Sequence, residues 1–151
     1  MLVSVFPAIP ASAEGKAEPL DVIYYEDGSY TVITIAEDFS SAPRSSARVM
    51  NTAGVKSGSK TFSHYSDGGV LAWAATLSAS FQYNGTSATC TAASCSVSIS
   101  NSAWYLISKS TSQSGNTATA EVSMGRKLLG VTVRTINCTI TLSCDANGNL
   151  S

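Results

Sequence analysis

One long run of alternating residues constrains the fold more than any other part of the chain. Between residues 71 and 83 every odd position carries an aromatic or aliphatic side chain, whereas small or polar residues hold the even positions (LAWAATLSASFQY). Alternation with a period of two predicts a β-strand with one buried face. The run ends at Asn84-Gly85, a pair typical of two-residue hairpin turns. We therefore expect a returning strand that places Cys90 opposite Ala79 on the core face.

The same alternation recurs later in the chain, and helix signals are almost absent. It covers residues 95–99, 118–124 and 136–144, with a turn signal at Gly115-Asn116. About seven short strands separated by turn signals are typical of two packed antiparallel sheets. The sequence therefore predicts an all-β fold, an antiparallel β-sandwich with the general architecture of an immunoglobulin domain.

The N-terminal part of the chain divides into three segments. Residues 1–13 are uncharged and end in Ala-Ser-Ala, the small-x-small pattern that signal peptidase accepts, but they lack a basic start. We expect a signal peptide that is truncated at its own N-terminus, and hence a secreted protein. Residues 14–36 predict a β-hairpin that turns at Asp27-Gly28, with Tyr25 and Tyr30 on one face. Residues 37–59, rich in Ser, Ala and Gly, predict a linker or long loop.

Residues 60–151 are expected to form the sandwich domain, stapled by disulfides. Cys90, Cys95, Cys138 and Cys144 are an even number of cysteines, as in exported disulfide-bonded proteins, and their spacing does not suit zinc. Cys138 and Cys144 lie on one predicted strand roughly 20 Å apart, beyond disulfide reach. We therefore predict the bonds Cys90–Cys144 and Cys95–Cys138, with the exchanged pairing as the alternative.

Composition and charge exclude several classes of function. Charged residues are 13% of the chain and the formal net charge is −1, whereas Ser and Thr number 26 and 15. This balance argues against a nucleic-acid-binding protein and against a polybasic membrane-surface protein. We also expect no membrane span, because the apolar stretches are shorter than one requires.

No constellation of residues predicts catalysis. His64 is the only histidine, and its neighbours Ser63, Ser66 and Asp67 are close in sequence without implying triad geometry. The carboxylate pairs Glu26-Asp27 and Glu37-Asp38 are better explained by a turn and a strand end. We therefore expect a protein that is not an enzyme and holds no metal or cofactor.

Three aromatic residues are the remaining candidates for binding. Trp104 is out of phase with Tyr105 and Ile107 and could therefore be exposed, as could Tyr24 and Tyr30 in the hairpin. A flat aromatic side chain on a sandwich face can stack on a sugar ring or pack into a partner.

Several segments together resemble a known group of proteins. These segments are DVIYYEDGSYTVITI, SGSKTFSHYSDGGVLAWAATLSASFQYNG and SKSTSQSGNTATAEVSMGRKLLGV, followed by ITLSCDANGNLS. The chain is similar to uncharacterised small secreted β-rich proteins of Gram-positive, largely anaerobic bacteria. This resemblance implies export and a β-rich domain, and no activity.

The expected function is therefore that of a secreted, non-catalytic binding or surface-associated module. Its partner would be a cell-wall or host glycan, or another surface protein. The alternatives are a secreted antagonistic factor, similar to a bacteriocin or toxin, and a small hydrolase that depends on His64.

Overall fold

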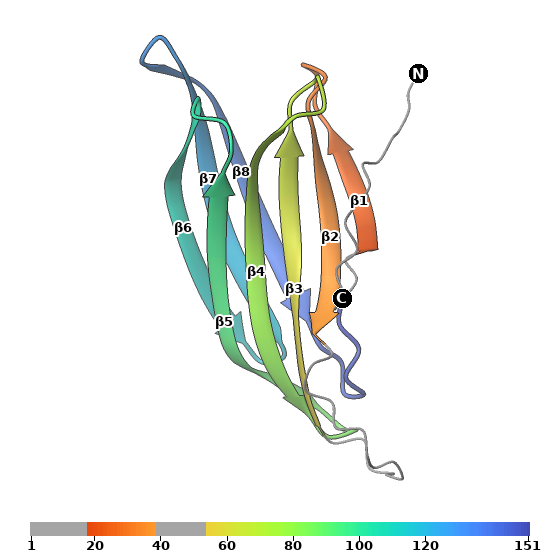
Figure 1. The fold of residues 1–151 in the computed structure, drawn as a ribbon. Helices are drawn as coiled ribbons and strands as arrows, with labels where there is room; N and C mark the ends of the chain where they lie inside the picture. Colours follow the sequence, from red (N-terminus) through yellow and green to blue (C-terminus); the bar gives the residue numbers. More distant parts are fainter. Residues whose placement is uncertain (1–17, 39–53) are drawn as a thin grey trace.

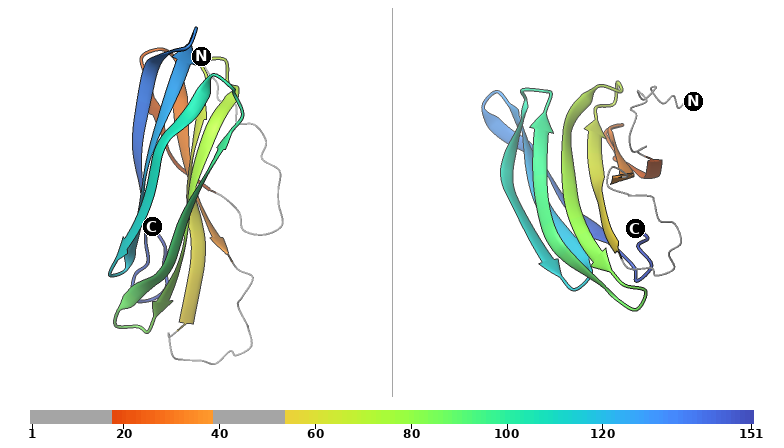
Figure 2. Two further views of the ribbon diagram at one scale, coloured as in Figure 1. Left: turned by 90° about the vertical axis from the view of Figure 1, so that its left-hand side faces the viewer. Right: turned by 60° about the horizontal axis from the view of Figure 1, so that its bottom comes forward.

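The computed structural model describes residues 18–38 and 54–151, which form eight strands in two antiparallel sheets (Figures 1 and 2). The five-stranded sheet contains β1–β5 in chain order, and the three-stranded sheet contains β6–β8 in chain order. The strand bounds are β1 Glu18–Tyr24, β2 Tyr30–Asp38, β3 Gly54–Tyr65, β4 Leu71–Tyr83, β5 Ala88–Ile99, β6 Trp104–Ser114, β7 Thr117–Leu128 and β8 Val131–Ser143. The predicted all-β class with two packed antiparallel sheets is confirmed.

The strand order is an up-and-down meander in both sheets. Immunoglobulin domains instead connect their strands as Greek keys, so their order within each sheet departs from the chain order. The likeness to such domains therefore extends to the packing of two sheets and does not include the topology.

The core lies between the two sheets and is built mainly from β4, β7 and β8. The predicted odd positions of β4 are buried from Trp73 to Phe81 and half-buried at Leu71 and Tyr83. They face the inner side chains of the other sheet, among them Val122, Met124, Ile140 and Leu142. The periodicity of residues 71–83 therefore identified the central strand of the core.

The β1–β2 hairpin has a different turn from the predicted one. The amide of Tyr25 donates to the carbonyl of Ser29, and Gly28 has a φ of +90°, so the loop has three residues, Glu26 to Gly28. Tyr24, not Tyr25, consequently pairs with Tyr30. A shift of one residue moves every side chain of a strand to the opposite face, so the predicted face of Tyr25 is wrong.

The β4–β5 hairpin also differs from the prediction, but without changing faces. Its turn is centred on Gly85-Thr86, and Cys90 pairs with Phe81 instead of Ala79. Because this shift is two residues, Cys90 still points into the core, where its exposed fraction is 4%. The predicted burial of Cys90 is confirmed.

The predicted segment boundaries need one correction. Residues 37–38 belong to β2 and residues 54–59 to β3, so the linker expected at 37–59 is too long. Its centre, residues 39–53, lies outside the described residues, as does the expected signal peptide at residues 1–13. The hairpin joins the main body because β2 pairs with β3 along its whole length.

Candidate functional site

The outer face of the five-stranded sheet is covered with small uncharged side chains. Across β2, β3, β4 and β5 the pairing aligns them into rows: Val32–Ser63–Ala74–Ser98, Thr34–Thr61–Thr76–Ser96 and Ala36–Ser59–Ser78–Ser94. A shorter row, Ser57–Ser80–Ala92, continues the pattern. Neighbouring strands are about 4.8 Å apart and alternate residues about 6.8 Å apart, so the hydroxyl groups form a regular grid.

The charged residues of β2 and β3 with described side chains point the other way. Glu37, Lys56 and Lys60 share the inner face with buried Phe62 and His64. Lys56 Nζ lies 3.1 Å from Glu37 Oε1, and Lys60 Nζ donates to the carbonyl of Thr141 over 2.7 Å. The described side chains of the outward rows therefore carry no charge, and the pairing places Asp38 of β2 opposite Ser57, at the end of the shorter row.

Part of this face is hollowed into an open groove of about 580 Å³. Its lining comes from small residues of the outward rows and from the inward-facing positions between them, which are Glu37, Gly58, Ala79 and Ala93; the outward residues are Ala36, Ser57, Ser59, Ser78, Ser80, Ala92 and Ser94. Two pairs of hydroxyls on the face are hydrogen-bonded across strands, Ser57 to Ser80 and Thr61 to Thr76, both at 2.9 Å. Each hydroxyl still has capacity to accept a further hydrogen bond.

Three tyrosines form an aromatic row at the end of the same face. The ring centroids of Tyr24 and Tyr30 are 5.9 Å apart, and Tyr30 stacks on Tyr65 at 5.2 Å with an interplanar angle of 14°. The exposed fraction of Tyr24 is 74%, while burial and the neighbouring Tyr30 raise the pKa of Tyr65. The row follows directly from the three-residue turn, because that turn pairs Tyr24 with Tyr30.

The structure thus brings together two of the three predicted binding aromatics and separates the third. Trp104 is buried in the core, with an exposed fraction of 6%, so its expected exposure is wrong. Its ring packs edge-on against His64 at 5.2 Å and lies 6.0 Å from Trp73. Tyr65 was missed, because only the pairing of β2 with β3 places it beside Tyr30.

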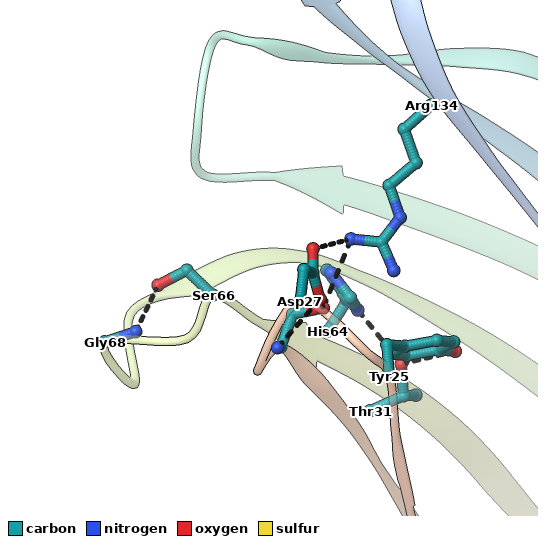
Figure 3. Close-up of polar contacts among 8 residues, drawn as sticks. Tyr25, Asp27, Thr31, His64, Ser66, Gly68 and Arg134 are labelled. Carbon is teal, nitrogen blue, oxygen red and sulfur yellow. Dashed lines mark hydrogen bonds and ion pairs between the residues drawn. The ribbon is translucent and has the colours of Figure 1, made fainter.

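A second, smaller polar site surrounds His64 (Figure 3). The His64 side chain is buried between Trp73, Trp104 and Tyr25, and its Nδ1 is 3.0 Å from Thr31 Oγ1. Thr31 is in turn hydrogen-bonded to the hydroxyl of Tyr25 at 3.2 Å. Desolvation, aided by the nearby positive charge of Arg134, lowers the pKa of His64 to about 4.

An ion pair closes this site toward solvent. Arg134 on β8 donates to Asp27 and to the hydroxyl of Ser29, so it ties the three-stranded sheet to the β1–β2 turn (Figure 3). Hydrogen bonds from Ser29, with the charge of Arg134, lower the pKa of Asp27. Together with Ser66, Asp67, Asn101 and Arg126, these groups line a pocket of about 70 Å³, the volume of a few water molecules.

His64 does not form a nucleophilic triad with its neighbours. Its Nδ1 is bonded to a threonine, whereas a triad requires a carboxylate there to orient and stabilise the imidazolium. Ser66 Oγ accepts hydrogen bonds from the amides of Gly68 and Val70, both at 3.3 Å, which stabilise the β3–β4 turn. The geometry is that of a buried neutral histidine that joins the two sheets.

The four cysteines are free thiols in this structure. Cys90 and Cys144 approach the β6–β7 turn from opposite sheets, since their amides donate to the carbonyls of the consecutive residues Gly115 and Asn116. Burial raises the pKa of Cys138 to about 11, and the neighbouring thiol of Cys95 adds to this shift. The predicted pairing stays a prediction.

The C-terminal loop, residues 145–149, is held together by the carboxylate of Asp145. Asp145 accepts hydrogen bonds from the amides of Asn147 and Asn149, at 2.8 and 2.9 Å, so its carboxylate stabilises the loop. Among the described residues no cluster of three or more His, Cys, Asp or Glu side chains has the arrangement of a metal site. Nor do residues 18–38 and 54–151 contain a helix that is long and apolar enough to cross a membrane.

Comparisons with known proteins supply no relative from which a function could be inferred. The chain matches no protein-family model, no curated protein and no solved structure.

Proposed function

We propose that the protein is a secreted, non-catalytic binding module, and that the outer face of its five-stranded sheet binds an uncharged polysaccharide. The observation that carries this proposal is the row of Tyr24, Tyr30 and Tyr65 at the end of a grid of hydroxyl groups. Export itself is supported by residues 1–13 and by the resemblance to secreted proteins.

The chemistry of the two parts of the face suits a sugar chain. A pyranose ring presents aliphatic C–H groups that pack against an aromatic face, as the exposed ring of Tyr24 would allow. Sugar hydroxyls both donate and accept hydrogen bonds, and serine and threonine hydroxyls do the same. The grid repeats across four strands, so it offers matching partners along an extended chain.

The absence of cations among the described side chains of the rows favours neutral over anionic polysaccharides. A neutral sugar displaces only water from this face, because the described side chains of its rows carry no ionic group that would lose hydration. An anionic polymer would find no cation there to offset the desolvation of its own charges. The face therefore favours a neutral chain over an acidic one.

The test is the retention of the protein on insoluble or gel-embedded polysaccharides. We expect binding to at least one neutral polymer in a panel of cellulose, chitin, β-glucan, mannan and xylan, and weaker binding to alginate and heparin. Replacing Tyr24 by Ala should weaken binding about tenfold, as for an aromatic residue that anchors an interface. Leu20→Ala on the same strand is the matched control, since Leu20 is half-exposed and lies outside the row.

A charge placed on the grid provides a second readout. Ser78→Glu should abolish binding to the neutral polymer, whereas Ser110→Glu, an equally exposed serine on β6 of the other sheet, should leave it unchanged. If the protein is retained by no neutral polymer, or if Tyr24→Ala and Ser78→Glu bind like the parent protein, the proposal is wrong.

A further inference from the structure

The turn between β7 and β8 exposes a cluster of aliphatic side chains. Leu128, Leu129, Val131 and Val133 have exposed fractions of 57, 94, 62 and 50%. The turn lies at the same end of the sandwich as the β1–β2 and β3–β4 turns and projects at the tip of the molecule (Figures 1 and 2). Contiguous exposed aliphatic groups of this kind mark interaction surfaces, because water would otherwise favour their burial.

The backbone of this turn does not favour a leucine. Leu129 has a φ of +56° and Gly130 a φ of +82°, and two positive values in succession define a type I′ turn. Its first position suits Asn, Asp or Gly, whereas a bulky L-residue there is strained. Among the described residues Leu129 is the only one other than glycine with a positive φ. The sequence thus keeps a large apolar side chain where it is both strained and fully exposed.

Basic residues flank the aliphatic cluster. Residues 126–134 read RKLLGVTVR and hold three of the nine Lys and Arg residues of the chain, with no acidic residue among them. The rest of the chain has six such cations against ten carboxylates, so its net charge is −4. Arg134 pairs with Asp27, while among the described residues no ion pair holds Arg126 or Lys127. The low charge of the whole chain thus conceals a local positive region at this tip.

We propose that the β7–β8 turn docks the protein on a lipid bilayer that contains anionic headgroups. Leu128, Leu129 and Val131 enter the boundary between headgroups and acyl chains, and Arg126 and Lys127 contact the lipid phosphates. Apolar side chains bordered by cations are the pattern that binds such interfaces, through buried area and attraction to anionic lipids.

The shape of the turn favours a bilayer over a folded protein partner. A stable protein interface buries about 800 Å² on each side and needs a complementary surface. Four aliphatic side chains on a narrow projecting turn offer much less area than that. A bilayer, in contrast, accommodates a projecting turn without a preformed cavity. This inference does not depend on the polysaccharide face, which belongs to the other sheet.

The experiment is co-sedimentation of the full chain with vesicles of phosphatidylcholine alone or mixed with phosphatidylglycerol. We expect binding to the mixed vesicles, weakened by high salt, and little binding to phosphatidylcholine. Leu129→Asn should lower the affinity about tenfold, the effect of one buried leucine side chain. Asn-Gly is also the preferred sequence of a type I′ turn, so this variant should melt at or above the temperature of the parent protein.

Two further variants complete the design. Val55→Thr is the matched control, because Val55 is 61% exposed but lies at the start of β3, at the opposite end of the sandwich, and it should bind vesicles like the parent (Figure 1). Lys127→Gln should weaken binding to mixed vesicles without changing the weak binding to phosphatidylcholine. All variants share the apolar residues 1–13, so differences between them report on the substituted positions.

The proposal is overturned by any of three results. The first is that the parent protein fails to sediment with mixed vesicles. The second is that Leu129→Asn binds these vesicles as tightly as the parent does. The third is that the parent self-associates without vesicles and that Leu129→Asn abolishes this association. The last result would show that the turn is a contact between copies of the chain.

Discussion

The buried neutral histidine predicts that acid destabilises this protein in a defined pH range. The pKa of His64 falls from 6.5 to about 4 on folding, because burial disfavours the imidazolium. Between these values the unfolded chain binds a proton that the folded chain does not, so stability falls as the pH is lowered. Each pKa unit corresponds to about 1.4 kcal/mol, which gives a loss of about 3 kcal/mol between pH 7 and pH 4.

The chain is well suited to this measurement because His64 is its only histidine. Carboxylates with ordinary pKa values of about 3.9 to 4.3 titrate mainly below pH 5, and Asp27, whose pKa is lowered further, loses its contribution only near pH 4 and below. Urea unfolding at pH 7, 6.5, 6, 5.5 and 5 should therefore isolate one group, and the single imidazole signal in proton NMR should report its pKa directly.

His64→Phe provides the control. Phenylalanine can keep the packing against Trp73 and Trp104 but cannot titrate, so the variant should have a flat stability profile between pH 7 and pH 5, whatever its absolute stability. A parent protein whose stability is constant over this range, or a slope that persists in His64→Phe, would refute the reasoning.

Two other predictions concern packing and the cysteines. Gly58→Ala should cost about 1–3 kcal/mol in the free energy of unfolding, because its Cβ would clash with Leu150 Cδ1 and lie 2.7 Å from the carbonyl oxygen of Ala36. Gly68→Ala, whose nearest neighbour would be 3.9 Å away, should change stability little. Both effects are measurable by denaturant unfolding, and equal stabilities would contradict the packing argument. Oxidation with glutathione disulfide followed by peptide mapping should give Cys90–Cys144 and Cys95–Cys138, and should raise the melting temperature; a Cys90–Cys95 link would contradict this pairing.

The sequence predicted most of the fold where side-chain alternation alone decides the structure. The buried face of residues 71–83 and the inward direction of Cys90 could be read from periodicity, and an error of two residues in the turn left them unchanged. The β1–β2 hairpin could not be read in this way. Asp27-Gly28 fits a two-residue turn and a three-residue loop equally well, and the choice between them decides which tyrosine joins the outer face.

The candidate site was predictable only in part, for the same reason. Tyr24 and Tyr30 were recognised as aromatic residues in a hairpin, but Tyr65 and the hydroxyl rows depend on how β2, β3, β4 and β5 align. Trp104 follows a short loop that turns it toward His64, a tertiary contact that local periodicity does not encode. In the sequence, Leu129-Gly130 cannot be distinguished from any other Leu-Gly pair, because the strain at Leu129 depends on its backbone conformation.

The two proposed surfaces lie on sheets that share one core, and their placement has a consequence that can be measured. The tyrosine row adjoins the β1–β2 turn, at the same end of the sandwich as the β7–β8 turn (Figure 1). The hydroxyl rows cross the strands and follow one another from there toward the other end of the sandwich. Arg134 fixes the two turns relative to each other through Asp27. A docked molecule would hold its tyrosine row near the bilayer and extend its grid away from the membrane.

Both surfaces should therefore be occupied at once, so the protein should attach vesicles to a neutral polysaccharide matrix. The retention of fluorescent mixed vesicles on a matrix that binds the protein measures this attachment. Leu129→Asn should weaken the retention of vesicles while the protein stays on the matrix, whereas Tyr24→Ala should weaken binding to the matrix while the protein still sediments with vesicles. If either substitution weakens both interactions while the fold stays intact, a single surface serves both ligands, and the division of roles between the sheet face and the turn is wrong.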